Sequence, residues 1–246
     1  MNAAARKGLW GPAVATLTAF AVLIGLGTWQ LERKAWKEDL IEAIGRKLAA
    51  TPVDLPPPTA WPHLDRAEWE FRRVRLAGEF QNDADALVYT SGSTLRTQTS
   101  GAGYWVFTPM RTCDTVLPVN RGFVPLDRKD ASTRVAGRVS GSLDIVGVLR
   151  WPDARSWFTP KDDPAKSTWF VRDPSVMAAE KSWGPVPPFY VEQEAPVPPG
   201  RLPVPGKLEP NLPNNHLQYA ITWFGLAAVL AGVFAVFARG RYRGEP

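Results

Sequence analysis

The sequence LWGPAVATLTAFAVLIGLGTW, residues 9–29, contains 21 consecutive residues without an ionisable side chain. A second run, LQYAITWFGLAAVLAGVFAVFA at residues 217–238, is also uncharged and contains 22 residues. At a rise of about 1.5 Å per residue, helices of these lengths match a hydrocarbon core of about 30 Å. Because a backbone in lipid must satisfy its own hydrogen bonds, the two runs predict transmembrane helices.

The charges around the two runs indicate the orientation of the chain. Basic residues lie on the terminal side of both runs: Arg6, Lys7, Arg239, Arg241 and Arg243. Since basic residues stay on the cytoplasmic side, residues 1–8 and 239–246 are expected inside and residues 30–216 outside. A second basic group follows the first run and argues weakly against this orientation: Arg33, Lys34 and Lys37.

A cleavable signal peptide is the alternative interpretation of the first run. Ala19-Phe20-Ala21 has the small-residue pattern of a cleavage site, but it lies inside the apolar run and not after it. The run is also longer than the 7–15 apolar residues typical of a signal peptide. We therefore expect an uncleaved membrane anchor.

The composition of the region between the runs excludes two classes of protein. The chain has a net charge of +5, but residues 30–216 hold 24 basic against 23 acidic residues, so no polyanion-binding surface is predicted. Cys113 is the only cysteine, so no intramolecular disulfide can form. An exported domain of this size must then be stabilised by a hydrophobic core.

The segments next to the two runs differ in character. Apolar residues at helical spacing predict that the first helix continues as an amphipathic helix over residues 31–49. Five prolines in residues 52–62 predict the end of this helix and a linker. Ten of the 24 prolines lie in residues 185–213, which predicts an extended, stiff and unpacked arm before the second run.

Between these segments the sequence predicts a mainly antiparallel, β-rich α+β domain, barrel-like or sandwich-like. Expected turns include Gln81-Asn82-Asp83, Ser91-Gly92-Ser93, Cys113-Asp114 and Arg121-Gly122. Asp173 as N-cap and Pro174 as first residue predict a helix to about Ser182. The expected strands are Arg72–Phe80, Ala86–Thr90, Gly103–Thr108, Thr115–Asn120, Val139–Leu149, Thr168–Val171 and Phe189–Glu192.

Catalytic motifs are absent from the sequence. There is no Gly-x-Ser-x-Gly, no His-Glu-x-x-His and no pair of nearby cysteines. With only His63 and His216, one copy of the chain cannot form a multi-histidine metal site. An enzyme is therefore the less favoured class.

His216 is the residue that the sequence singles out as a candidate ligand. It precedes the second run, and antiparallel helices place it beside the outer end of the first, where Gly25 and Gly27 allow close helix approach or leave space for a flat group. A neutral imidazole is a common axial ligand of haem iron, and the helix N-terminus favours anionic propionates. A histidine at a membrane boundary can equally bond only to water, lipid or backbone.

Two further residues carry alternative interpretations. Arg121 either caps a strand turn or pairs through its planar fork with an acidic group on a ligand or partner. His63, in a proline-flanked loop, is a weaker ligand candidate than His216. Trp29 and Gln30 have an ordinary explanation as interfacial anchors of the first helix.

Four segments of the chain carry short motifs: LGTWQLERKAWK at 26–37, PVNRGFVP at 118–125, WFTP at 157–160 with DDP at 162–164 and WFVRD at 169–173, and NNHLQYA at 214–220 with Trp223-Phe224. Together they resemble the Surfeit-locus family of cytochrome c oxidase assembly proteins. The resemblance covers residues 9–238, and the order and spacing of the segments agree with the family pattern. The segment Lys161-Asp162-Asp163 is a departure, since the family pattern has Asn before the Asp-Pro pair.

This resemblance implies an assembly factor of the bacterial inner membrane, with its central domain in the periplasm. It implies that haem a is held for insertion into subunit I of the oxidase, with His216 as axial ligand of the iron. Assembly intermediates and haem a synthase are the other implied partners. The expected haem-binding residues are His216, Trp29, Gln30, Gln218, Tyr219 and Arg121.

Two alternatives to a haem carrier remain open. A membrane adaptor without haem would stabilise an oxidase assembly intermediate, with His216 incidental. An enzyme that modifies haem or quinone would need catalytic residues that the sequence does not contain.

Overall fold

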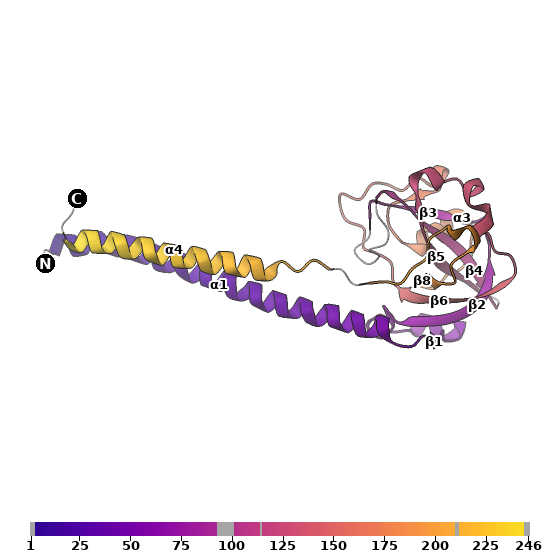
Figure 1. Ribbon diagram of the computed structural model, residues 1–246, viewed down its shortest axis with the longest axis horizontal. Coiled ribbons are helices and arrows are strands. Elements are labelled where there is room, and N and C mark those ends of the chain that lie inside the picture. Colours follow the sequence, from indigo (N-terminus) through magenta and orange to yellow (C-terminus); the bar gives the residue numbers. More distant parts are fainter. Residues whose placement is uncertain (1–2, 93–100, 114, 210–211, 244–246) are drawn as a thin grey trace. The chain divides into compact units, whose positions relative to one another are not determined.

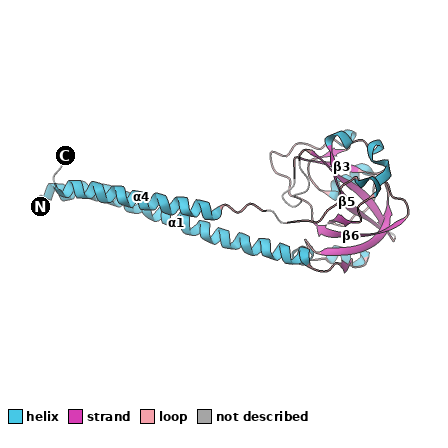
Figure 2. Cartoon of the chain, in the orientation of Figure 1, coloured by secondary structure: helices cyan, strands magenta, loops and turns pink. Residues whose placement is uncertain are grey.

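The computed structural model describes residues 3–92, 101–113, 115–209 and 212–243. The chain divides into two units: residues 1–42 with 213–246, and residues 43–212. The first is a helix unit and the second a β-rich unit (Figures 1 and 2). The helices are α1 (Ala3–Ala49), α2 (Arg66–Trp69), α3 (Pro174–Lys181) and α4 (His216–Arg243).

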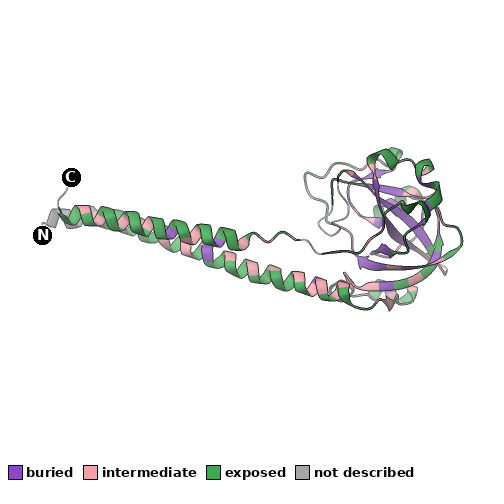
Figure 3. Ribbon diagram, viewed as in Figure 1, coloured by how far each residue is buried: buried purple, intermediate pink, exposed green. Residues whose placement is uncertain are grey.

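The helix unit contains both apolar runs. Residues 9–29 lie in α1, which continues without a break to Ala49, as the sequence predicts. Residues 217–238 lie in α4, and both helices are long and apolar enough to cross a membrane. The side chains of this unit are mostly exposed (Figure 3). Exposed apolar surface of this extent is typical of helices that are covered by lipid.

A stripe of shielded residues, repeating every three or four positions, runs along each helix. This spacing averages 3.5 residues, the repeat of a left-handed coiled coil. On α4 the most buried members are Ala220 and Ala227, each 1% exposed. Along α1 the stripe comprises Leu9, Ala13, Thr16, Phe20, Leu23, Gly27, Gln30, Lys34, Lys37 and Ile41, and Ile24 and Leu26 beside it are also partly shielded.

The β-rich unit is a closed barrel with three added strands. β2 pairs with β6, β6 with β8, β8 with β5 and β5 with β4, and a β2–β4 pairing closes the ring. All of these pairings are antiparallel except β5–β8. The strands are β1 (Val53–Asp54), β2 (Arg73–Phe80), β3 (Ala86–Thr90), β4 (Gly103–Thr112), β5 (Thr115–Pro125), β6 (Ser142–Arg150), β7 (Thr168–Trp169) and β8 (Tyr190–Ala195).

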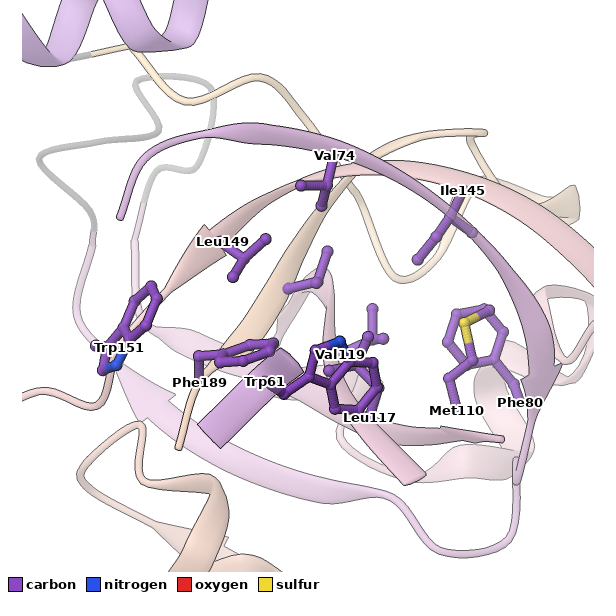
Figure 4. Close-up of a cluster of buried hydrophobic side chains, with 11 residues drawn as sticks. Trp61, Val74, Phe80, Met110, Leu117, Val119, Ile145, Leu149, Trp151 and Phe189 are labelled. Atoms are coloured by element: carbon purple, nitrogen blue, oxygen red, sulfur yellow. The ribbon is translucent and has the colours of Figure 1, made fainter. Parts of the chain in front are cut away.

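Two hydrophobic clusters stabilise this unit. The first contains apolar side chains of the five barrel strands together with Trp61 and Phe189 (Figure 4). Val119 and Val191, partners in the parallel β5–β8 pairing, are both fully buried in it. The second cluster packs α3, through Met177 and Ala178, against β3, β4 and β5. The α3 helix begins as predicted, because Asp173 accepts hydrogen bonds from the backbone N–H groups of Ser175 and Val176.

The predicted turn at Arg121-Gly122 is wrong, because β5 runs through it to Pro125. Trp105 pairs with Phe123 and Phe107 with Asn120, so two residues of β5 face one of β4. This is a β-bulge, and Gly122 permits it with a φ of 127°. A Cβ at Gly122 would lie 2.0 Å from the carbonyl oxygen of Val204, so a larger residue does not fit.

The proline-rich segments pack on the barrel over much of their length, as far as Leu208 in the second, so the predictions of a linker and of an unpacked arm are wrong there; the predicted end of the first helix is confirmed, since α1 ends at Ala49. In residues 52–62, β1 pairs with β2, and Trp61 is 4% exposed. In residues 185–213, β8 completes the barrel, Val204 bridges to Phe123, and Leu208 is 4% exposed. Proline lacks a backbone donor but tolerates extended conformations at sheet edges, so a high proline content alone does not distinguish a packed edge from a free arm.

The remaining differences are at the ends of elements. β4 and β8 extend past their predicted C-termini, whereas β7 ends earlier and β6 begins three residues later than predicted. The turn at residues 82–83 is present. The expected turns at 91–93 and 113–114 include Ser93 and Asp114, which lie outside the described residues.

Candidate functional site

His216 is the first residue of α4, and its ring contacts α1 directly. Its Nδ1 lies 2.7 Å from Oε1 of Gln30, a hydrogen bond between residues 186 positions apart. Both residues belong to the shielded stripes, so the bond lies on the face where the two helices meet. The sequence-based placement of His216 beside the outer end of the first helix is therefore confirmed within this unit.

This hydrogen bond determines which ring nitrogen can bind a ligand. An amide oxygen can only accept, so the Nδ1 that faces Oε1 of Gln30 must carry the proton. A neutral ring protonated at Nδ1 keeps its lone pair on Nε2. In the part of the chain that the structure describes, no hydrogen bond involves Nε2. In the neutral ring, Nε2 is therefore the nitrogen that can donate a lone pair to a ligand.

Three other predicted residues of this site, Trp29, Gln218 and Tyr219, are exposed near the hydrogen-bonded pair of His216 and Gln30. Trp29 and Tyr219 are 53% and 55% exposed, so both rings are accessible. Gln218 is exposed as well, and its backbone carbonyl accepts a hydrogen bond from Thr222. Side chains at these three positions are free to contact a flat ligand, but none of them bonds to His216.

Gly25 and Gly27 of α1 have different surroundings. A Cβ at Gly27 would lie 2.4 Å from the Phe224 ring, so this glycine permits the close approach of α4. A Cβ at Gly25 would have no atom within 4 Å. The sequence analysis proposed that these glycines either allow close helix approach or leave space. Gly27 allows close approach, and Gly25 has open space beside it.

One polar contact and one unpartnered polar atom near His216 were not predicted from the sequence. Lys37 donates a hydrogen bond to the carbonyl oxygen of Pro213, which holds the residues before α4 against α1. Oδ1 of Asn214 is buried and has no hydrogen-bond partner among the described residues. The spacing of Lys37 from Gln30, seven residues along one helix face, is the signal that could have indicated the Lys37 contact.

Arg121 lies in the barrel unit and is only 3% exposed. Its Nη1 donates to Oδ1 of Asn82 at 2.9 Å, and its Nη2 donates at 2.5 Å to the carbonyl oxygen of Gly137. Its guanidinium also stacks on the Phe80 ring, 4.3 Å from the centroid. The bulge therefore directs Arg121 into the barrel unit, where its hydrogen bonds connect three segments, whereas His216 belongs to the helix unit.

The remaining candidates do not form a site. His63 is exposed at the end of a short helix over residues 58–63. Among the described residues there is no cluster of three or more His, Cys, Asp or Glu side chains that could hold a metal ion. His216, with its ring oriented by Gln30, is thus the one histidine that the helix unit offers as a metal ligand.

The chain therefore combines two long apolar helices, a β-barrel and one histidine, His216, whose ring is oriented by a hydrogen bond between the two helices. A model of the SURF1 family matches residues 17–228, and the chain belongs to this family.

Similar proteins of this family cover most of the chain. A "SURF1-like protein" of Monosiga brevicollis is 36% identical over 96% of this chain and 91% of its own length. "Surfeit locus protein 1" of Rattus norvegicus is 34% identical over 85% of this chain and 69% of its own. The protein of the same name from Homo sapiens is 32% identical over 94% of this chain and 78% of its own.

Proposed function

We propose that this protein is a membrane-bound assembly factor for cytochrome c oxidase that holds haem a for insertion into subunit I. Membership of the SURF1 family supports the role in oxidase assembly. The observation that supports the haem site is the 2.7 Å hydrogen bond between His216 and Gln30, which leaves Nε2 available.

The residues at this site fit a haem group. Histidines that bind metals usually donate their second ring N–H to an oxygen acceptor, and Gln30 supplies that acceptor. The exposed rings of Trp29 and Tyr219 offer apolar surface for a porphyrin, and Oδ1 of Asn214 is a buried acceptor without a partner among the described residues. Bound haem supplies an iron that takes an axial nitrogen ligand.

The chain's own residues account for reversible holding. Gln30 orients the imidazole, and Lys37 secures the segment that leads into α4. If haem binds, His216 would hold its iron as the one histidine of the helix unit, so a receiving protein would have a single histidine to replace. A single ligand favours transfer over permanent storage.

The proposal includes an arrangement in the membrane. α1 and α4 cross the bacterial inner membrane with both chain ends in the cytoplasm, and the barrel is periplasmic. His216 and Gln30 then lie at the periplasmic end of the helix pair. Subunit I, assembly intermediates and haem a synthase are the proposed partners on this side.

An adaptor without haem is the second candidate, because one surface feature favours protein contacts. Trp157 and Phe158 are 95% and 73% exposed and pack edge to face on a loop. Arg155 fastens this loop by bonding to the carbonyl oxygen of Pro160 and to Asp162. A fixed loop that presents two aromatic side chains is typical of a docking surface.

Absorption spectra of the detergent-purified protein, from cells that make haem a, test the proposal. The wild type is compared with His216→Ala and with His63→Ala, which removes the chain's other histidine from an exposed position. We expect Soret and α bands of the haem a type in the wild type and in His63→Ala. In His216→Ala these bands are expected to be lost or shifted.

Two results would contradict the haem site. Unchanged bands in His216→Ala would remove His216 as the iron ligand. Absence of haem from all three proteins, with oxidase subunits still co-purifying, would favour the adaptor.

A further inference from the structure

A basic pocket with a volume of about 480 Å³ lies on the barrel unit, remote in sequence from the helix ends. Its walls come from the β2–β3 turn, β3, the segment 129–138 around a short helix over residues 131–137, the segment 166–167 and α3. The acidic residues in the wall are Asp83, Asp85 and Asp130. The basic residues are Lys129, Arg134, Arg138, Lys166 and Lys181.

The three carboxylates are already engaged. Asp85 pairs with Arg134 at 2.7 Å and accepts a hydrogen bond from Thr108 at 2.6 Å. Asp83 pairs with Arg138 at 2.5 Å. Asp130 caps the helix over residues 131–137 by accepting from the backbone N–H of Ser132. The acidic side chains therefore leave a positive excess in the pocket.

The excess charge comes from two lysines on different elements. Nζ of Lys129 bonds to Oγ1 of Thr168 at 2.9 Å, and Nζ of Lys181 bonds to Oγ of Ser167 at 2.6 Å. Lys166, the third lysine of the pocket, pairs with Asp163 at 3.1 Å. The ammonium groups of Lys129 and Lys181 bond instead to hydroxyls of neighbouring residues, and Asp163 acts on Lys129 only through its charge.

Two arginines next to these lysines have unused donors. Arg134 is 6% exposed, lines the pocket, and its Nε has no hydrogen-bond partner in the described chain. Arg121 lies behind it, and its Nε is also buried without such a partner. Burial lowers the pKa of Arg121 to about 10; Asp85 opposes this shift, and the charges of Arg134 and Arg138 add to it.

We propose that this pocket binds a phosphate group, either free or as part of a lipid headgroup. Cations on three separate elements suit a tetrahedral anion, whose oxygens point in several directions, better than a planar carboxylate. The hydroxyls of Ser167 and Thr168 add polar contacts at the same wall. This inference does not depend on the haem site, because it uses only residues of the barrel unit.

Titration calorimetry of the full-length protein in detergent tests the site. The probes are inorganic phosphate and dihexanoyl-phosphatidylglycerol below its micelle concentration, each at matched ionic strength in chloride. The test variant is Lys129→Met/Lys181→Met, since methionine keeps apolar contact with the Tyr104 and Trp169 rings that the lysines approach. Lys161→Met, at an exposed position outside the pocket, is the control.

We expect the wild type and Lys161→Met to bind at least one probe and the double variant to bind it more than tenfold more weakly. Binding of phosphate alone would indicate a free anion, and preference for the lipid would indicate a headgroup. Equal binding by the double variant, or no binding to either probe by the wild type, would overturn the proposal. Binding of a poly-glutamate peptide, with no binding of either phosphate probe, would also overturn it and indicate an acidic protein partner. Near-ultraviolet circular dichroism of the double variant checks that the barrel is folded.

Discussion

At the scale of single residues, the pairing of Gln30 with His216 makes a prediction about ligand affinity. Gln30→Leu keeps the imidazole but removes the oxygen that accepts its Nδ1–H. Loss of such an orienting partner typically weakens metal binding 10–100-fold. Haem titration followed by absorbance should therefore show a weaker site that still has an axial histidine.

Gln218→Leu is the matched control for this substitution. Gln218 lies two residues after His216, and its exposed side chain does not bond to the ring. We expect its effect on haem affinity to be smaller than that of Gln30→Leu. The reverse order of the two effects would show that Gln30 does not orient the ligand.

A buried ion pair in the barrel gives a second prediction at this scale. Arg172 donates to Glu192 at 3.0 Å and to Asp153 at 2.7 Å, and the Glu192 side chain is 2% exposed. Arg172→Met should lower the free energy of unfolding by roughly 2–3 kcal/mol, because Glu192 loses a close charged partner while it stays buried. Urea unfolding measures this change.

The exposed pair of Arg75 and Asp54 provides the comparison. Their side chains are 57% and 86% exposed and 3.3 Å apart. Surface pairs contribute about 0–1 kcal/mol, so Arg75→Met should have little effect on unfolding. Equal losses in the two variants would show that burial does not determine the contribution of Arg172.

At the scale of elements, the contact between α1 and α4 depends on Gly27. Gly27→Leu would place side-chain atoms where the Phe224 ring now lies, so the helices must separate. We expect a lower thermal midpoint in detergent and loss of the Nδ1–H form of His216, which ¹⁵N NMR of the ring detects. Gly25→Leu has open space at the same depth and should preserve both properties. A similar loss in the Gly25 variant would contradict the helix contact.

The secondary elements themselves were largely predictable, because their signals are local. The helix over α1, the cap at Asp173 and most strand positions follow from periodicity and from residue types a few positions apart. The course of β5 through Arg121-Gly122 was not predictable in this way. A glycine after a polar residue is typical of a turn, and only the pairing with β4 makes it a bulge.

At the scale of the whole molecule, the proposed orientation predicts the labelling of the one cysteine. Cys113 is free and exposed in the barrel unit. A membrane-impermeant maleimide should label it in intact spheroplasts, because the barrel is proposed to be periplasmic. Protein mass spectrometry measures the extent of labelling.

The control replaces Cys113 and introduces a new cysteine near the end of α4. In a Cys113→Ser background, Arg241→Cys should react only after the membrane is permeabilised, since the C-terminus is proposed to be cytoplasmic. Labelling of Arg241→Cys in intact spheroplasts, together with no labelling of Cys113 in the wild-type protein, would contradict the proposed topology and indicate the opposite orientation.

Some features of the candidate site were predictable from the sequence, and others required the tertiary structure. Sequence alone indicated His216 and the helix end beside it, because an isolated polar residue next to an apolar run is visible without any contact. Only the structure showed the hydrogen bond between Nδ1 of His216 and Oε1 of Gln30, the close approach of the helices at Gly27 and the burial of Arg121. Each of these depends on which residues of distant segments lie opposite one another.

The sequence by itself determined the two apolar helices, the β-rich region, the resemblance to a family and the absence of known catalytic motifs. These features depend on hydrophobicity, periodicity and short motifs, which act over a few residues. Only the tertiary structure decided that β8 closes the barrel between β5 and β6, that the proline-rich segments pack, and that basic residues of separate elements line one pocket. Such contacts join residues far apart in the chain, and their register follows from packing of the whole core.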